Sequence, residues 1–251
     1  MVSNIIPFSE SVDAGNPADA PRQSDVAYGD VLQAIIVCDI APGTLVSEAS
    51  LSERFGCRKA AMRAALERLA AIGMVEPVAR RGYRVKAITL RDVNNLFQVR
   101  EIIELPVVRA AAATVDAGAL RMLDAVRAAD YVPGDRRSEA RFLHENTRFH
   151  LLIAESAGNE RLTAMLAQLY GEMERLFHFG LALRDRSQEM TREHTALIEA
   201  LAAGDADTAV KVMAEEHASS KAMVLDAIMR SDTLLDVSLS AARRGEDGDS
   251  G

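Results

Sequence analysis

The sequence contains no tryptophan, and aromatic residues make up only 4% of its 251 residues. Its two cysteines, Cys38 and Cys57, are too few for a disulfide framework, so we expect buried thiols in a reducing cytoplasm. No run approaches the roughly 18 to 20 consecutive apolar residues of a membrane-spanning helix. The first residues include Asn, Ser, Glu and Asp in place of a basic segment followed by an apolar one, so we expect no secretory signal.

What the sequence does contain favours two helical domains. Hydrophobic residues make up 49% of the chain, enough to form cores, and 251 residues suffice for two domains. The abundance of Ala, Leu, Arg and Glu favours helices. The terminal segments 1–23 and 232–251 are polar and without periodicity, so we predict a disordered leader and a disordered tail. We expect the two domains to span residues 24–87 and 88–231.

Positive charge is concentrated in one part of the chain. The net charge of −8 argues against a protein that binds nucleic acid over its whole surface. Ten Lys and Arg residues nevertheless fall between positions 54 and 91, where the only acidic residues are Glu67 and Glu76. One local basic surface on an acidic protein is the pattern of a DNA-binding module.

Residues 24–87 show the element order of a winged helix-turn-helix. Apolar residues recur at helical intervals over 25–37 and 58–72, and Ser47 is a suitable N-cap for a short helix over 51–55. A β-hairpin with a basic turn is predicted over 74–85. The third helix would enter a major groove with its N-terminal end, and the wing would reach phosphates or a minor groove. The residues predicted to contact DNA are Arg58, Lys59, Arg63, Arg80, Arg81 and Gly82. The alternative is that the basic residues are only solvated charges on a small α/β domain.

The same region resembles a known family. Ala-Pro-Gly-Thr-Leu-Val-Ser-Glu at 41–48, Leu-Ser-Glu-Arg-Phe-Gly-Cys at 51–57 and Leu-Glu-Arg-Leu-Ala-Ala-Ile-Gly-Met-Val-Glu at 66–76 are similar to the GntR family of bacterial transcriptional regulators. In that family the third helix usually begins Ser-Arg-Thr-Pro-Val-Arg-Glu-Ala-Leu, where this chain has Arg-Lys-Ala-Ala-Met-Arg-Ala-Ala-Leu at 58–66. Arg63 matches, whereas Lys59 replaces the family's first arginine. Because Lys cannot make the bidentate fork of arginine to guanine, we expect the framework to carry over but not the base preference.

Residues 88–231 are predicted to form an antiparallel all-α bundle of six or seven helices. Thr89 is a suitable N-cap for a long first helix, which Pro106 either interrupts or ends, and Asp116 is a suitable N-cap for the next. Further helices are expected over 143–157, 160–183, 188–203 and 205–229. Short connections between helices favour an antiparallel bundle. The predicted fold class is therefore mainly α, with an N-terminal winged helix-turn-helix and a C-terminal helical bundle.

Three of the five histidines share one pattern. His150, His194 and His217 each lie on a predicted helix with apolar residues three and four positions away, which places them near an inward face. Asn146 lies one turn before His150 on the same face. An inward histidine is often only a hydrogen-bonded core residue. These residues form a metal site only if their helices converge, which spacing alone does not show.

The second domain resembles the FCD effector domain of the FadR-type GntR regulators. The resemblance is carried by Phe149-His150, Ala-Gly-Asn at 157–159, Glu193-His194, Gly204-Asp205 and His217. It implies a divalent metal ion, commonly zinc or nickel, held by three histidines and an Asp or Asn. The ligands implied in this sequence are Asn146, His150, His194 and His217, and imidazole with one oxygen donor suits such ions. The open coordination positions would take water or the carboxylate of an effector.

Asn146 and Arg100 both bear on which small molecule this site would bind. Asn146 stands where aspartate is more frequent, and its neutral side chain predicts weaker metal binding and stronger attraction of an anion. Arg100 occupies a position where the family often has an arginine pointing into the pocket, which would suit a carboxylate. It would equally suit an ion pair at the surface or at an interface. His144 and His178 lie off the pattern and are expected to be ordinary, partly exposed histidines.

The sequence therefore predicts a cytoplasmic transcriptional regulator, a repressor, that binds an inverted-repeat DNA operator as a homodimer. A small organic acid would coordinate the bound metal and shift the helical domain between two conformers. Two alternatives stay open: a metal sensor, in which the metal itself is the signal, and a metal-dependent hydrolase or lyase. We expect no enzymatic activity, because no clear general base is paired with the site and a winged helix would be a strange addition to an enzyme.

Overall fold

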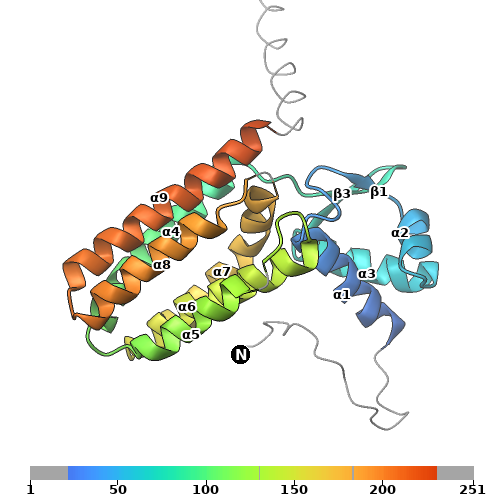
Figure 1. Cartoon of the computed structure of the whole chain (residues 1–251). Helices are drawn as coiled ribbons and strands as arrows, with labels where there is room; N and C mark the ends of the chain where they lie inside the picture. Colours follow the sequence, from blue (N-terminus) through green and yellow to red (C-terminus); the bar gives the residue numbers. More distant parts are fainter. Residues whose placement is uncertain (1–21, 130, 183, 231–251) are drawn as a thin grey trace, which may run out of the picture. The chain divides into compact units, whose positions relative to one another are not determined.

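The computed structural model of the chain describes residues 22–129, 131–182 and 184–230, and the chain divides into two compact units, residues 1–87 and 88–251 (Figure 1). The leader predicted over 1–23 lies outside the described residues except for positions 22 and 23, and the tail predicted over 232–251 lies wholly outside them. Each unit has a hydrophobic core of its own.

Unit 1 is a winged helix-turn-helix, as predicted. Its elements in chain order are α1 (Gln23–Ile36), β1 (Leu45–Val46), α2 (Glu48–Arg54), α3 (Lys59–Ala71), β2 (Val75–Val78) and β3 (Gly82–Val85). The strands form an antiparallel sheet in the order β1-β3-β2, with Val75 opposite Val85 and Leu45 opposite Arg84. β2 and β3 form the predicted hairpin. The two-residue β1 is too short to show strand alternation, so only its pairing with β3 defines it.

The core of unit 1 lies where α1 packs on α3. Val31 and Ile35 of α1 and Leu66 and Leu69 of α3 are completely buried, and their spacing places each pair on one helix face. Full burial of each such side chain contributes about 1.5–3 kcal/mol. This packing holds α3 so that its first residue, Lys59, stays exposed to solvent.

The helix α2 begins earlier than predicted. The side chain of Ser47 accepts a hydrogen bond from the backbone N–H of Ser50 at 3.0 Å, and the backbone N–H of Ser47 donates to the Ser50 hydroxyl at 3.2 Å. This reciprocal capping box starts the helix at Glu48. The predicted range began at Leu51 because the first turn carries only polar or small residues and shows no apolar periodicity.

Gly82 lies where the wing meets β1. Its φ is +102°, and a Cβ atom at this position would lie 2.3 Å from the carbonyl oxygen of Val46. The left-handed backbone and the close approach of Val46 both require a residue without a side chain. The backbone of unit 1 therefore requires a glycine at this position, in addition to the predicted close approach of Gly82 to DNA.

We expect Gly82→Ala to destabilise unit 1 by about 1–3 kcal/mol, because the strained backbone and the contact with Val46 must both be relieved. The matched control is Gly29→Ala in α1, where an added Cβ meets no heavy atom within 4 Å. A helical Gly-to-Ala change stabilises by roughly 0.5–1 kcal/mol. Chemical denaturation followed by circular dichroism measures both variants, and equal midpoints would contradict the prediction.

Unit 2 is an all-α bundle. The described residues form α4 (Leu90–Ala111), α5 (Ala117–Ala129), α6 (Arg136–Ser156), α7 (Glu160–Leu181), α8 (Ser187–Ala202) and α9 (Ala206–Arg230). α4 packs against α6, α7 and α9, α5 packs against α6 and α8, and α8 packs against α9 (Figure 1). Six helices with short connections agree with the predicted bundle. Among the described residues, every helix is too short or too polar to span a lipid bilayer.

Polar caps set the helix boundaries of unit 2. Thr89 forms a capping box with Asp92 at the start of α4, and the side chains of Asp135 and Asn159 cap α6 and α7. The cap at Asp135 places the start of α6 two turns before position 143, where prediction from apolar spacing began it. α4 continues through Pro106 to Ala111.

The prediction for His178 was wrong, whereas His144 is exposed on α6. The side chain of His178 is completely buried on α7, and neither ring nitrogen has a hydrogen-bond partner. Burial, together with the positive charge of Arg136, lowers the pKa of His178 to about 4, so the ring is neutral at pH 7. The sequence pattern failed because α7 is covered on several sides, so that its buried face is wider than one apolar stripe.

Candidate metal and effector site

Four residues that the sequence analysis selected as metal ligands lie inside unit 2. α6 carries Asn146 and His150, α8 carries His194, and α9 carries His217. Asn146 is 5% exposed, and the three histidines are at most 1% exposed. All four side chains therefore face the interior of the bundle, where an unpaired polar group is costly.

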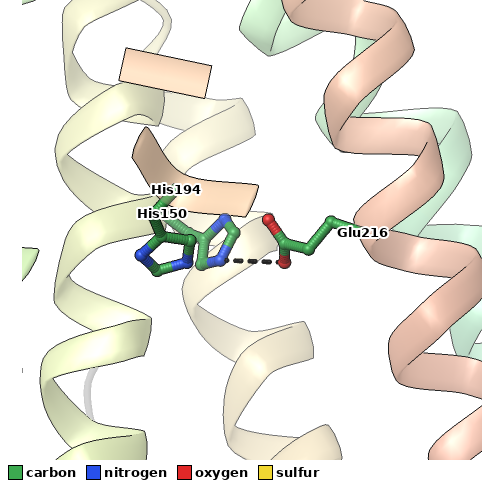
Figure 2. Close-up of side chains that lie close together, drawn as sticks. All are labelled: His150, His194 and Glu216. Carbon is green, nitrogen blue, oxygen red and sulfur yellow. Dashed lines mark ion pairs between the residues drawn. The ribbon is translucent and has the colours of Figure 1, made fainter. Parts of the chain in front are cut away.

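The structure brings two of these histidines together with a residue that the sequence analysis missed. One ring nitrogen each of His150 and His194 and one carboxylate oxygen of Glu216 all lie within 4.8 Å of one another. Figure 2 shows the Glu216 carboxylate facing the two imidazole rings, with a 3.3 Å contact between its Oε1 and Nε2 of His150. The sequence Ala-Glu-Glu-His did not distinguish buried Glu216 from its exposed neighbour Glu215, because a charged residue carries no apolar signal.

His217 joins this group through a second buried carboxylate. Its Nε2 lies 2.8 Å from Oε2 of Glu104, and the other oxygen of Glu104 lies 2.9 Å from Nδ1 of His150. Glu104, on α4, thus stands between His217 and His150. The structure therefore places His217 next to the cluster of His150, His194 and Glu216, with Glu104 as the link.

Arg100, on α4, lies beside the carboxylates of Glu104 and Glu216. Its Nε donates to Glu104 at 2.7 Å, and its Nη2 donates to the hydroxyl of Tyr170 at 2.7 Å and to Glu216 at 3.1 Å. The side chain is 1% exposed, so these are internal ion pairs and not a surface pair. Burial opposes the charged form of Arg100, but the nearby charges of Glu104 and Glu216 outweigh it and raise its pKa.

The two carboxylates also set the protonation of His150. Burial by itself lowers the pKa of this ring, but the negative charges of Glu216 and Glu104 outweigh burial and raise the pKa to about 9. Burial also disfavours the charged form of Glu216, yet His150 and Arg100 hold its pKa below the ordinary value. At pH 7 the site without metal therefore contains two carboxylates, one guanidinium and one imidazolium.

Asp124 on α5 determines how His194 presents its ring. Its Oδ1 lies 2.7 Å from Nδ1 of His194 and accepts hydrogen bonds from Arg127 at 2.9 and 2.7 Å. Because an ionised carboxylate only accepts, Nδ1 carries the hydrogen and the lone pair of Nε2 stays free. Phe149 stacks on the same ring, with centroids 4.0 Å apart. Burial lowers the pKa of His194, so its ring is neutral, as a metal ligand must be.

Several buried atoms of the cluster have no hydrogen-bond partner. They are Nε2 of His194, Oδ1 of Asn146, Oε2 of Glu216 and Nδ1 of His217. Buried polar atoms are rarely left unsatisfied, and a group of them calls for an explanation such as an ion. Imidazole nitrogens with carboxylate and amide oxygens form a donor set suited to zinc or nickel. The residues present therefore fit a divalent metal ion.

The free space beside the cluster is small. A cavity bordered by Arg100, Asn146 and Glu216 has a volume of about 10 Å³ open to the centre of a water molecule. A single water needs roughly this volume. The rest of its lining is mainly apolar, with Leu143 and Phe177 among the residues. Any organic ligand of this site would have to displace side chains.

The predicted DNA-contacting residues lie on unit 1. Arg58 is the N-cap residue of α3 without a side-chain cap bond, and Lys59 begins the helix. Arg63 forms a pair with Glu48 of α2, with Nη2 2.9 Å from Oε2, and its side chain is 62% exposed. An exposed pair is worth at most about 1 kcal/mol, so Arg63 can exchange Glu48 for another acceptor.

The remaining predicted contacts lie in the wing. Arg80 and Arg81 are both exposed in the turn that joins β2 to β3, and Arg80 adopts a positive φ of 61°. Gly82 follows as the first residue of β3. The basic residues of the wing and those of α3 therefore belong to the same compact unit.

A winged helix-turn-helix unit followed by an all-α unit is the layout of a two-domain transcriptional regulator. Residues 23–85 match the family of bacterial regulatory proteins named gntR, and residues 95–218 match the FCD domain. The chain belongs to the GntR family of transcriptional regulators and carries an FCD domain, as its sequence resemblance implied.

Relatives of known name agree with this assignment. The HTH-type transcriptional repressor RspR of Escherichia coli (strain K12) is 25% identical over 200 residues, which cover 80% of this chain and 87% of that protein. The HTH-type transcriptional regulator LutR of Bacillus subtilis (strain 168) is 26% identical over 199 residues, which cover 70% of this chain and 89% of that protein.

Solved structures show the same fold. The structure of E. coli McbR/YncC superposes with a TM-score of 0.61 at 20% identity, covering 82% of this chain and 99% of that one. A putative GntR regulator from Rhodococcus sp. RHA1 gives a TM-score of 0.59 at 21% identity, covering 82% and 98%. At these identities the likeness concerns the fold alone.

We expect Arg100→Met to destabilise unit 2 by about 3–5 kcal/mol, because it leaves the buried charges of Glu104 and Glu216 without their cation. The control is Arg109→Met on the same helix, whose partner Asp207 is 87% exposed and whose pair is worth at most about 1 kcal/mol. Thermal denaturation of the metal-free protein compares the two. Similar melting temperatures for both variants would contradict the buried ion-pair network.

Proposed function

We propose that this GntR-family regulator represses transcription by binding an inverted-repeat operator as a homodimer, and that a divalent metal ion in its FCD domain modulates the binding. The observation that carries the proposal is the group of buried ligand atoms without partners in unit 2, in a chain whose other unit is a helix-turn-helix. A repressor that acts on the chromosome of a bacterium works in the cytoplasm. Two protomers would present two α3 helices to two half-sites.

In this proposal DNA is bound by Arg58, Lys59, Arg63, Arg80, Arg81 and Gly82. α3 would place its N-terminal residues in the major groove, and the wing would contact phosphates or the minor groove. Lys59 supplies a point charge where a family member often has a bidentate arginine, so the base preference should differ. The exposure of Lys59, Arg80 and Arg81 supports this assignment.

The metal ion, zinc or nickel, would be held by Asn146, His150, His194 and His217. When bound, the ion supplies a Lewis-acidic positive charge in the interior of the bundle. Asp124 holds His194 in the tautomer that leaves Nε2 free, and Phe149 stacks on the face of its ring. The nearness of Glu104 and Glu216 supports binding of a cation, because these carboxylates already attract the proton on His150.

A small carboxylate that joins the metal, with Arg100 as its partner, is the effector expected from the sequence. The position of Arg100 at the edge of the cavity supports this version. The metal-sensor version is favoured by the internal ion pairs of Arg100. We propose no catalytic role for the site, and turnover of a carboxylic acid or ester by the metal-loaded protein would instead support a hydrolase or lyase.

The DNA interface is tested by the salt dependence of binding to operator fragments selected from random DNA. We expect Arg80→Ala with Arg81→Ala to reduce the slope of log affinity against log salt by about 2, because each lost phosphate contact removes about 0.9 from the slope. Arg121→Ala, an exposed arginine of unit 2, serves as the control and should leave the slope unchanged. An unchanged slope in the double variant would remove the wing from the interface.

The metal site is tested by titrating zinc or nickel into protein freed of metal with a chelator. We expect His150→Ala to weaken binding by about 10- to 100-fold or more, whereas His144→Ala, an exposed histidine of the same helix, changes nothing. Because His150 has a pKa of about 9 without metal, binding should release a proton at pH 7.5 and tighten as the pH rises towards 9. Equal binding by the two variants would refute the site.

A further inference from the structure

We propose that Glu216 is an internal carboxylate ligand that occupies the place of the expected effector, so that a divalent metal ion alone completes the site and is the signal. This inference rests on the proposed metal site, and it specifies that the site binds a metal ion without an organic acid. It makes the protein a metal-responsive regulator, and it predicts that a carboxylic acid adds nothing to metal binding.

The position of Glu216 carries the inference. Its Oε1 lies 3.3 Å from Nε2 of His150 and accepts a hydrogen bond from Arg100 at 3.1 Å. Its Oε2 is buried and has no hydrogen-bond partner. One Glu216 oxygen lies within 4.8 Å of the ligand nitrogens of both His150 and His194 (Figure 2). The carboxylate thus contacts both the arginine and an imidazole through Oε1 and keeps Oε2 without a partner, which is how an effector carboxylate would be placed.

Two of the three guanidinium nitrogens of Arg100 already bind internal partners. Its Nε is bonded to Glu104, and its Nη2 is shared by Tyr170 and Glu216. An incoming carboxylate that bound the Nε–Nη2 edge of Arg100 would have to separate it from one of these glutamates. That glutamate would then be left as an unpaired charge in the interior, which is strongly unfavourable.

The size of the site points the same way. The cavity beside Glu216 offers about 10 Å³ to the centre of a water molecule, which is room for roughly one water. Even a two-carbon acid has four heavy atoms and exceeds this space. A bare metal ion needs no such cavity, because it lies between its ligand atoms.

The charges of the site come close to balance for a metal without an added anion. Arg100 and a divalent ion bring three positive charges, and Glu104 and Glu216 bring two negative ones. Without Glu216 the excess would be two positive charges, which would attract an anion. With Glu216 in place this attraction is reduced by half, so an effector carboxylate gains less from joining the ion.

The ion pairs that would change on metal binding belong to the helix that follows the DNA-binding unit in the chain. Arg100 and Glu104 lie on α4, and four residues separate its start at Leu90 from the end of β3 at Val85. A metal ion that binds Glu216 weakens its pairing with Arg100 and so biases the contacts of α4. The metal would then bind one conformer of α4 more tightly than another. A signal requires such a difference in affinity.

The experiment measures zinc affinity of the full-length metal-free protein by competition with a chromogenic chelator, with and without sodium acetate. We expect acetate to change the affinity of the wild-type protein by less than about twofold. Glu216→Gln should weaken zinc binding by about 10- to 100-fold, whereas Glu215→Gln, its exposed neighbour on α9, should bind as the wild type does. Acetate should restore much of the lost affinity in Glu216→Ala, where it can enter the vacated space.

Operator binding under the same conditions supplies the second readout. Zinc alone should shift operator affinity of the wild type fully, and acetate should add no further shift. Wild-type zinc binding that acetate tightens by about tenfold or more, or Glu216→Gln that binds as tightly as the wild type, would overturn the role of Glu216 while leaving the metal site standing. If His150→Ala also binds zinc as the wild type does, the proposed metal site itself fails. The measurement of wild-type zinc affinity with and without acetate tests the proposal even if a Glu216 variant does not fold.

Discussion

The interior of unit 2 depends on one constraint, which is that the buried carboxylates of Glu104 and Glu216 need a positive charge beside them. Each is 2% exposed, and both bond to Arg100, which is 1% exposed. A charge buried this deeply is tolerated only when an opposite charge and further hydrogen bonds compensate it. Tyr170 and His150 supply the remaining contacts, so α4, α6, α7 and α9 meet through one polar network.

The same network explains why histidines of three helices can serve as ligands. Asp124 fixes the tautomer of His194, and Glu104 holds His217 close to His150. Each ring is therefore oriented by a carboxylate on another helix, an arrangement that raises the basicity of metal-binding histidines. The buried atoms without partners are what remain when these supporting bonds have been made. Among them, His194 and Glu216 belong to one group of potential ligand residues with His150.

Unit 1 differs, because the basic residues predicted to contact DNA are exposed and the constraints are those of backbone geometry. The buried face of α3 holds the helix, and its N-terminal end stays in solvent. Gly82 allows β3 to approach β1 so closely that a side chain would collide with Val46. Unit 1 thus carries exposed basic residues, whereas unit 2 encloses a network of buried charges. The family match assigns both parts to one class of protein.

Local sequence determined much of this protein. Apolar periodicity and caps such as Ser47 and Thr89 predicted the elements, and histidine spacing with the family resemblance selected His150 and His194 as neighbours. Tertiary structure alone decided which polar residues accompany them. Glu104, Asp124 and Glu216 carry no periodic signal. Each pairs with a residue that lies far away in the chain, namely His217, His194 and Arg100 respectively. The burial of His178 escaped prediction for the related reason that neighbouring helices, and not its own sequence, decide how much of α7 is covered.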